Sequence, residues 1–197
     1  MDVMEAIRER RSIRRYRTDP ITNEVLATLL EAARLAPSWA NTQCWRLVVV
    51  RDQAIKNRLA EVLSSAHSGR GNRCNQAVRE APVVIVTCAQ KGLSGIYRSG
   101  EHQGKPATDK GEYWYMFDVA LAMHGLTLAA QSQGLGTVHV GHFDPALVAK
   151  VLNVPDDVAV VEIMPVGYPA EAPQARPRKP LEEIVFYDGY RTPQAQP

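Results

Sequence analysis

Residues 117–137, FDVALAMHGLTLAAQSQGLGT, contain the longest apolar stretch of helical character in the chain. Apolar side chains fall on almost every face of a helix over 118–133, so solvent can cover little of it. We therefore expect this helix to be enclosed on several sides, either by the core of its own chain or by a second subunit. Gly134 can end the helix, and Gly136 relieves the turn that follows.

Short apolar, β-branched runs before and after this helix are typical of buried strands. They are WRLVVV (45–50), APVVIVTCA (81–89), TVHVGHF (137–143) and VAVVEIMPVGYP (158–169). Capping residues and helical spacing predict further helices over 2–10, 23–35, 54–63 and 145–152. No internal repeat or break in composition demands a second domain.

Three segments lack periodicity. Residues 64–76 are loop-like, and 91–112 are long and rich in glycine and lysine, which favours a lid or binding loop. The tail over 171–190, EAPQARPRKPLEEIVFYDGY, begins as a proline-rich arm too polar to pack alone and finishes with the strand-like EIVFY (183–187). An arm of this kind often reaches across to another chain.

The charge and the cysteine content limit the partners and the cellular compartment that we expect for the protein. Its 23 basic and 21 acidic residues leave a net charge of +2, so no global signal points to nucleic acid or to an anionic membrane. Three scattered cysteines form neither a disulfide framework nor a CxxC pair, and the charged N-terminus does not resemble a signal peptide. The apolar stretch over 119–130 is shorter than the roughly 20 residues that span a bilayer. We expect a cytoplasmic protein without a membrane segment.

Positive charge is nevertheless concentrated in RERRSIRRYR (8–17), which holds six arginines. If the chain is extended there, Arg10, Ser12 and Arg14 share one face and can clamp a phosphate, because the guanidinium fork binds its oxygens in pairs. A solvated helix end is the alternative. A nucleic-acid arm is the third, although the chain adds only RPRK (176–179) to such a surface.

Four blocks, taken together, resemble the FMN-dependent nitroreductase family in order and spacing. They are RRSIRRY (10–16), APSWANTQCWRLVVV (36–50), FDVALAMHGLTLAAQSQGLGT (117–137) and RPRKPLEEIV (176–185). The resemblance covers nearly the whole chain. It implies an α+β fold in which a central mixed sheet is flanked by helices, formed by a single domain over 1–197. It also implies an intertwined homodimer with two FMN sites at its interface, in which the arm over 170–197 reaches the partner subunit.

The same resemblance implies a phosphate site built from the two arginine clusters. Its residues are Arg10, Arg11, Ser12, Arg14, Arg176 and Arg178. A loop resembling the family's PSxxNxQPW would contact the flavin of the partner subunit. Its contacts are Pro37, Ser38, Asn41 and Gln43, and Cys44 stands where the family has proline.

The loop that follows the buried helix would approach the flavin ring edge through its backbone. Its residues are His139, Val140, Gly141 and His142. A backbone N–H aimed at the reactive nitrogen stabilises reduced flavin, and glycine permits close approach.

The activity implied by this resemblance is that of an NAD(P)H-dependent FMN oxidoreductase. Hydride would pass from NAD(P)H to flavin N5 and then, in a second half-reaction, to a small electron-poor acceptor such as a nitroaromatic or a quinone. NAD(P)H would be a transient reductant, because GLGTVHVG (134–141) lacks the glycine placement of a dinucleotide fold. Reductive dehalogenation, flavin fragmentation, peptide-ring oxidation and a non-catalytic FMN sensor or storage protein remain alternatives.

Several other residues allow two interpretations. Asn75 can contact the flavin ring or simply cap a loop. Tyr97 and Trp114 can stack over a substrate or anchor the core. His139 and His142 would point to opposite faces of a strand, so we expect no metal site.

Overall fold

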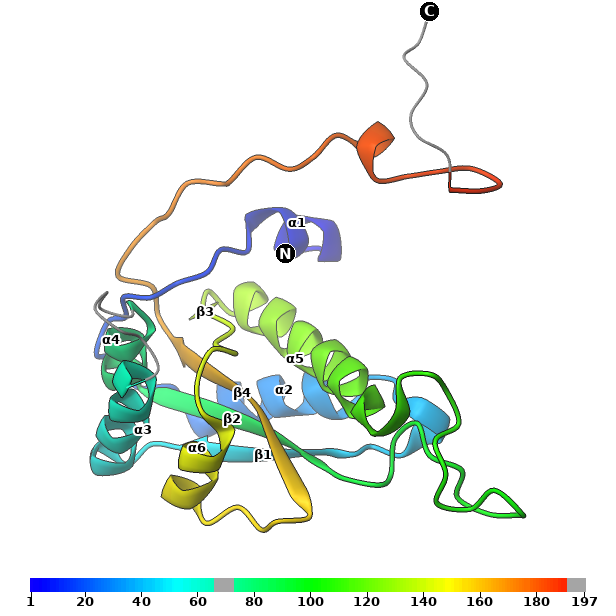
Figure 1. Cartoon of the computed structure of the whole chain (residues 1–197). Helices are drawn as coiled ribbons and strands as arrows, with labels where there is room; N and C mark the ends of the chain where they lie inside the picture. The colour runs from blue at the N-terminus through cyan, green and yellow to red at the C-terminus, as the bar shows by residue number, and fades with distance from the viewer. Residues whose placement is uncertain (66–72, 191–197) are drawn as a thin grey trace, which may run out of the picture.

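The computed structural model describes residues 1–65 and 73–190, which form a four-stranded sheet covered by helices (Figure 1). The strands pair in the order β1-β2-β4-β3. Their bounds are Trp45–Val50 for β1, Val83–Gln90 for β2, Gly136–Thr137 for β3 and Val158–Gly167 for β4. Each expected apolar run therefore contributes to the sheet, although TVHVGHF forms only a short strand and an isolated bridge between Val140 and Ile163.

The described residues form six α-helices. They are α1 (Val3–Glu9), α2 (Asn23–Arg34), α3 (Gln53–Ser65), α4 (Arg73–Glu80), α5 (Trp114–Ser132) and α6 (Pro145–Leu152). Short 3-10 turns cover Trp39–Asn41, Gly111–Tyr113 and Leu181–Glu183. Asp2 caps α1, and Asp144 caps α6 ahead of Pro145, as the sequence predicts. Glu5 completes a capping box with Asp2.

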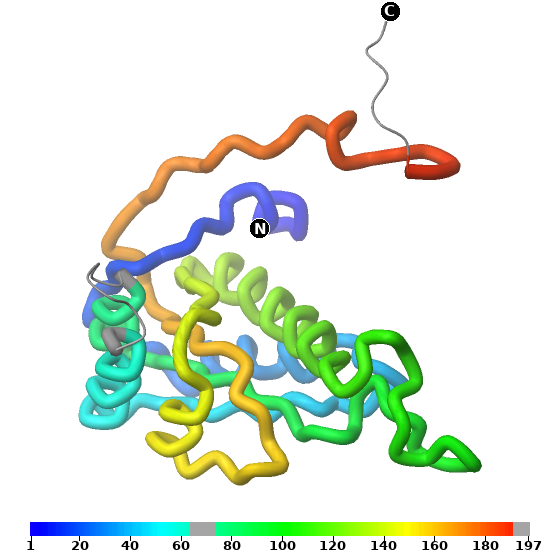
Figure 2. Tube along the Cα trace, viewed as in Figure 1, coloured from blue at the N-terminus to red at the C-terminus, as the bar shows by residue number. Residues whose placement is uncertain are grey.

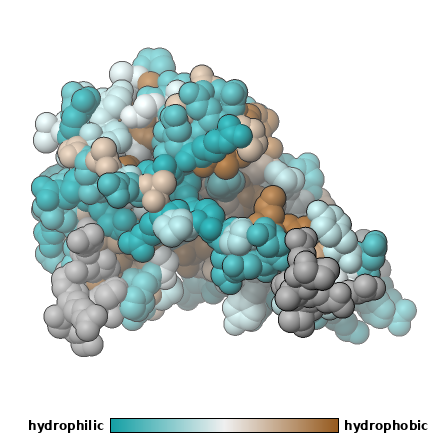
Figure 3. Space-filling view, turned by 90° about the horizontal axis from the view of Figure 1, so that it is seen from above, coloured by the Kyte–Doolittle hydropathy of each residue, from teal (hydrophilic) through white to brown (hydrophobic). Residues whose placement is uncertain are grey.

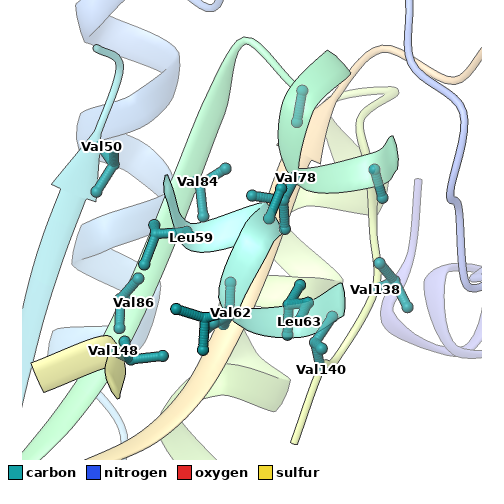
Figure 4. Close-up of a cluster of buried hydrophobic side chains, with 14 of the residues drawn as sticks. Val50, Leu59, Val62, Leu63, Val78, Val84, Val86, Val138, Val140 and Val148 are labelled. Carbon is teal, nitrogen blue, oxygen red and sulfur yellow. The ribbon is translucent and has the colours of Figure 1, made fainter. Parts of the chain in front are cut away.

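The central strand β2 divides the core into two layers. Val84 and Val86 belong to the cluster that α3, α4 and α6 cover (Figure 4). Val83 and Ile85 belong to the opposite cluster, which α2 and α5 cover. Because successive side chains of a strand point to opposite faces, one strand that is buried from Val83 to Ala89 serves both layers.

Three expectations from the sequence need correction. The sheet is antiparallel rather than mixed, since all named strands pair antiparallel and the parallel pairing is the one-residue bridge between Ser12 and Thr137. Residues 64–65 and 73–76 are helical rather than loop, while 66–72 lie outside the described residues. EIVFY is not a strand, because in the described part of this chain no sheet edge runs beside it to accept its hydrogen bonds.

The arginine-rich segment is held extended along the sheet edge. The N–H of Ile13 donates to the carbonyl of Thr137 at 2.9 Å, and the N–H of Arg17 donates to that of Tyr168 at 2.9 Å. Ile13 and Tyr16 are each only 5% exposed, and burial raises the pKa of the Tyr16 hydroxyl. The apolar residues among the arginines therefore anchor the segment and leave its basic side chains outside.

After β4 the chain leaves the body as an extended arm. Figure 2 shows this arm, in orange and red, passing above α1. Its apolar side chains Leu181, Ile184 and Tyr187 are largely exposed. Among the described residues, no helix has the length and apolar character needed to cross a membrane.

A substitution at Gly136 tests whether the packing of Ile13 on this glycine holds the arginine segment in place. An alanine Cβ at this position would lie 2.4 Å from Cγ1 and 2.7 Å from Cβ of Ile13, so the two segments would have to separate. We expect Gly136→Ala to cost about 1–3 kcal/mol of stability. This corresponds to a fall of about 2–4 °C in Tm for each kcal/mol in a chain of this size.

The control is Gly141→Ala, because nothing lies within 4 Å of a Cβ at Gly141. Thermal unfolding followed by circular dichroism compares the two variants. Equal Tm values would show that the packing of Ile13 on Gly136 does not hold the segment.

Candidate functional site

A pocket of about 960 Å³ lies between the arginine-rich segment and the arm. All six residues assigned to the phosphate from the sequence line it: Arg10, Arg11, Ser12, Arg14, Arg176 and Arg178. Arg8, Arg15, Gln76 and Glu171 also line the pocket. The fold thus brings together two basic clusters from opposite ends of the sequence.

The guanidinium groups of this pocket differ in what they contact. Nη1 of Arg11 folds back onto the carbonyl oxygens of Arg8 and Arg10, at 2.6 and 2.9 Å. Nε of Arg15 lies 3.2 Å from a carboxylate oxygen of Glu80. Among the seven arginines that line the pocket, four have no hydrogen-bond or ion-pair partner for their side chains within the described residues: Arg8, Arg10, Arg176 and Arg178.

The charge of the pocket suits an anion. Seven arginines face a single carboxylate, that of Glu171. Unpaired guanidiniums converging from two segments match a phosphate, whose oxygens accept several charge-assisted hydrogen bonds. Seen from the side of α1 and the arm, the surface is mostly hydrophilic, with hydrophobic residues visible near its middle (Figure 3).

Glu171 is a site residue that sequence reasoning missed. Its Oε1 accepts a hydrogen bond from the backbone N–H of Arg14, and the N–H of Ala170 donates to the carbonyl of Arg15 at 2.9 Å. These two contacts fasten the root of the arm to the arginine segment. No local pattern could reveal them, because the partners lie more than 150 positions apart.

The loop over 139–142 begins beside this segment. Val140 exchanges both backbone hydrogen bonds with Ile163, at 3.0 Å each, so its N–H and carbonyl serve the sheet. Gly141 is exposed, and the space around it is open. His139 is also exposed, with Nδ1 2.7 Å from Oε1 of Glu162 and Nε2 3.2 Å from Oγ1 of Thr127. Gly141, rather than Val140, therefore has the freedom that close approach to a ligand requires.

The loop over 37–43 has an unusual backbone. Ala40, Asn41 and Gln43 all adopt left-handed conformations, with φ of 43°, 54° and 47°. Each such non-glycine residue stores about 1–3 kcal/mol, and strain of this kind persists only when surrounding contacts hold it. The N–H of Gln43 donates to Oγ of Ser38 at 2.9 Å, and its side-chain amide donates to Asn41 at 3.2 Å. Pro37, like Asn41 and Gln43, is exposed.

This loop and the arginine-rich segment lie at opposite ends of α5 (Figure 1). The N–H of Trp39 donates to Asp118 near the start of the helix, whereas Ile13 bonds to Thr137 beyond its end. A helix rises about 1.5 Å per residue, so the stretch from Asp118 to the helix end alone covers about 20 Å.

The remaining candidates lie elsewhere. Asn75 is half-buried in α4, and its neighbour Gln76 reaches the arginine pocket instead. The Trp114 ring packs 4.9 Å from that of Trp39, so it supports the strained loop. Tyr97, 44% exposed, lies in the 91–112 segment, whose own pocket of about 600 Å³ is lined by residues including Lys110 and Tyr113.

Two of the three cysteines, Cys44 and Cys88, are buried thiols of low reactivity. Burial together with the nearby Asp118 carboxylate raises the pKa of Cys44 to about 12. Burial raises the pKa of Cys88 to about 11. Such thiols stay protonated near neutral pH and are poor nucleophiles. Over residues 1–65 and 73–190, no group of three histidine, cysteine or acidic side chains is arranged to hold a metal.

Comparison with known proteins identifies relatives along most of the chain. The family model described as the nitroreductase family matches residues 7–168. The NADH dehydrogenase of Thermus thermophilus is 34% identical over 207 residues, covering 95% of this chain and 96% of its own.

Solved structures with similar folds include an oxidoreductase and a deiodinase. The NADPH:FMN oxidoreductase of Vibrio harveyi, complexed with NAD+, superposes with a TM-score of 0.76 at 26% identity, covering 96% of this chain and 78% of its own. Iodotyrosine deiodinase bound to FMN and 3-iodo-L-tyrosine gives a TM-score of 0.78 at 25% identity. The match covers 96% of this chain and 100% of the deiodinase chain. The family predicted from the four sequence blocks is confirmed: this chain belongs to the nitroreductase family.

Proposed function

We propose that this protein is an NAD(P)H-dependent oxidoreductase that holds FMN in the arginine pocket. The observation that carries the proposal is the convergence of two basic clusters on one pocket whose guanidiniums are largely unpaired. Relatives named as NADH dehydrogenase and NADPH:FMN oxidoreductase support it. When bound, FMN supplies the hydride chemistry that connects NAD(P)H with an electron-poor acceptor.

The residues of the pocket divide the work of holding the phosphate. Arg10 and Ser12 approach from the N-terminal segment, and Arg176 and Arg178 from the arm. Glu171 holds the backbone of Arg14 and so fixes the angle at which the two segments meet. The open surroundings of Gly141 leave room for the ring edge close to the backbone.

A homodimer would complete the site. In one chain the loop over 37–43 and the arginine pocket are separated by much of the length of α5, so one small cofactor can contact both only if a second chain supplies one of them. Exposed apolar side chains on α1, on α5 and on the arm support such an interface. Examples are Met4, Phe117, Leu121, Leu181 and Ile184.

The acceptor we propose is a small planar, electron-poor molecule such as a nitroaromatic or a quinone. Dehalogenation is the second candidate, favoured by the likeness to iodotyrosine deiodinase over nearly the whole of both chains. Two assays distinguish these activities. Faster NAD(P)H oxidation on adding a nitroaromatic or a quinone would support the first acceptor class, and halide release from an iodinated tyrosine would support dehalogenation. Bound flavin with neither activity would favour a sensor or storage protein.

Arg14→Ala tests the phosphate clamp. Each charge-assisted hydrogen bond to the phosphate contributes about 1.5–3 kcal/mol. FMN should therefore bind about tenfold or more weakly to the variant. Fluorescence titration with FMN and with riboflavin measures the two affinities. Riboflavin lacks the phosphate, so it should bind the wild type poorly, and its affinity should change little in the variant. The control is Arg58→Ala, an exposed arginine of α3 outside the pocket. Unchanged FMN affinity in Arg14→Ala would mean that the clamp lies elsewhere.

Mixed dimers test whether the loop acts on the partner's cofactor. Two differently tagged chains are co-expressed, with Arg14→Ala and Asn41→Ala placed either on separate chains or on the same chain. If each site combines one chain's arginines with the other chain's loop, separate placement leaves one intact site in each dimer. Placement on one chain leaves none. FMN content after gel filtration measures the difference, and the opposite pattern would show that both contacts come from one chain.

A further inference from the structure

Asp118 is a buried carboxylate that collects hydrogen bonds from two separate segments. It lies in α5 and is 1% exposed. The N–H of Trp39 lies 3.1 and 3.2 Å from its two oxygens, and the Cys44 sulfur lies 3.7 Å from Oδ2. The hydroxyl of Ser94 donates to the same Oδ2. No cation in the described part of the chain pairs with it.

The contacts of Asp118 are all donors. A backbone N–H, a hydroxyl and a thiol each offer a proton, and an ionised carboxylate is the side chain that only accepts. The raised pKa of Cys44, about 12, keeps its thiol protonated and able to donate. The site is therefore matched to a negative charge that three donors stabilise.

Two of these donors flank the strained loop. Between Trp39 and Cys44 the backbone holds three left-handed non-glycine residues, a conformation that needs external support. The ring of Trp39 packs on Trp114, at the start of the same helix. Asp118 thus fastens the loop to α5 at both of its ends. Its third partner, Ser94, lies near the root of the 91–112 segment.

We propose that Asp118 is a positioning residue for the cofactor. It fixes the turn that presents Asn41 and Gln43, although it is itself buried and does not reach the surface where those two side chains lie. This inference rests on the proposed function, in which these two side chains contact FMN. The sequence gives no hint of the role, because an aspartate inside an apolar helix pattern carries no recognisable motif.

Asp118→Asn tests the proposal with almost no change of shape. The amide nitrogen of asparagine donates, so it faces one of the three donors and that contact is lost. We expect FMN to bind about tenfold more weakly to this variant. We also expect iodoacetamide to label Cys44 faster in the cofactor-free protein, because both the loop and the charge that raises the thiol pKa have changed.

Thr87→Val is the matched control. Thr87 is 0% exposed and its hydroxyl lies 2.9 Å from the Met123 sulfur, in the core beneath α5 and apart from the loop. The Thr87→Val variant should have a lower Tm. Its FMN dissociation constant and its rate of Cys44 labelling, both measured well below Tm, should equal those of the wild type. If Asp118→Asn does not fold, Ser94→Ala removes one donor to the same carboxylate. It should shift both readouts in the same direction, by about threefold in affinity.

The outcomes separate the two hypotheses. Wild-type protein that takes up no FMN contradicts the proposed function itself. FMN binding to wild type that stays unchanged in Asp118→Asn, or in Ser94→Ala where that variant replaces it, overturns only the positioning role of Asp118. Weaker binding with faster Cys44 labelling, and no such change in Thr87→Val, is the expected result.

Discussion

The burial of α5 against one face of the sheet is the constraint on which the rest of the structure depends. Ala122, Met123 and Leu126 are fully buried against β2, β4 and α2, which fixes where both ends of the helix lie. Near its start, α5 holds Asp118, which is hydrogen-bonded to the strained loop. Beyond the end of α5 the chain forms β3, and the arginine segment pairs with that strand. One packed helix therefore sets the separation of the strained loop and the arginine segment.

Charge is the second organising feature. A chain with a net charge of only +2 gathers seven arginines around one pocket. Other contacts must hold these like charges together. The side chains of Ile13 and Tyr16 anchor the arginine segment in the core, and Glu171 ties the arm to the same segment. A bound dianion would relieve the mutual repulsion of the guanidiniums, so we expect cofactor and fold to stabilise each other.

Much of this could be predicted from the sequence, where a local pattern carried the information. Alternating and helical spacings predicted the strands and most of the helices. The arginine spacing predicted that Arg10, Ser12 and Arg14 share one face, and the family resemblance added Arg11, Arg176 and Arg178; all six line the arginine pocket. The antiparallel sheet, the helix α4 and the contacts of Glu171 and Asp118 depend on residues distant in sequence, which no window of the chain can reveal. EIVFY has the composition of a strand, but a strand forms only where a neighbouring edge accepts its hydrogen bonds.

The most direct test of the account is the visible absorption spectrum of the purified protein, followed by identification of any chromophore released on heating. We expect a yellow protein that releases FMN, or a colourless one that becomes yellow and thermally more stable when FMN is added. A colourless protein that takes up no added FMN would contradict this expectation, and the arginine pocket would then need a different anion.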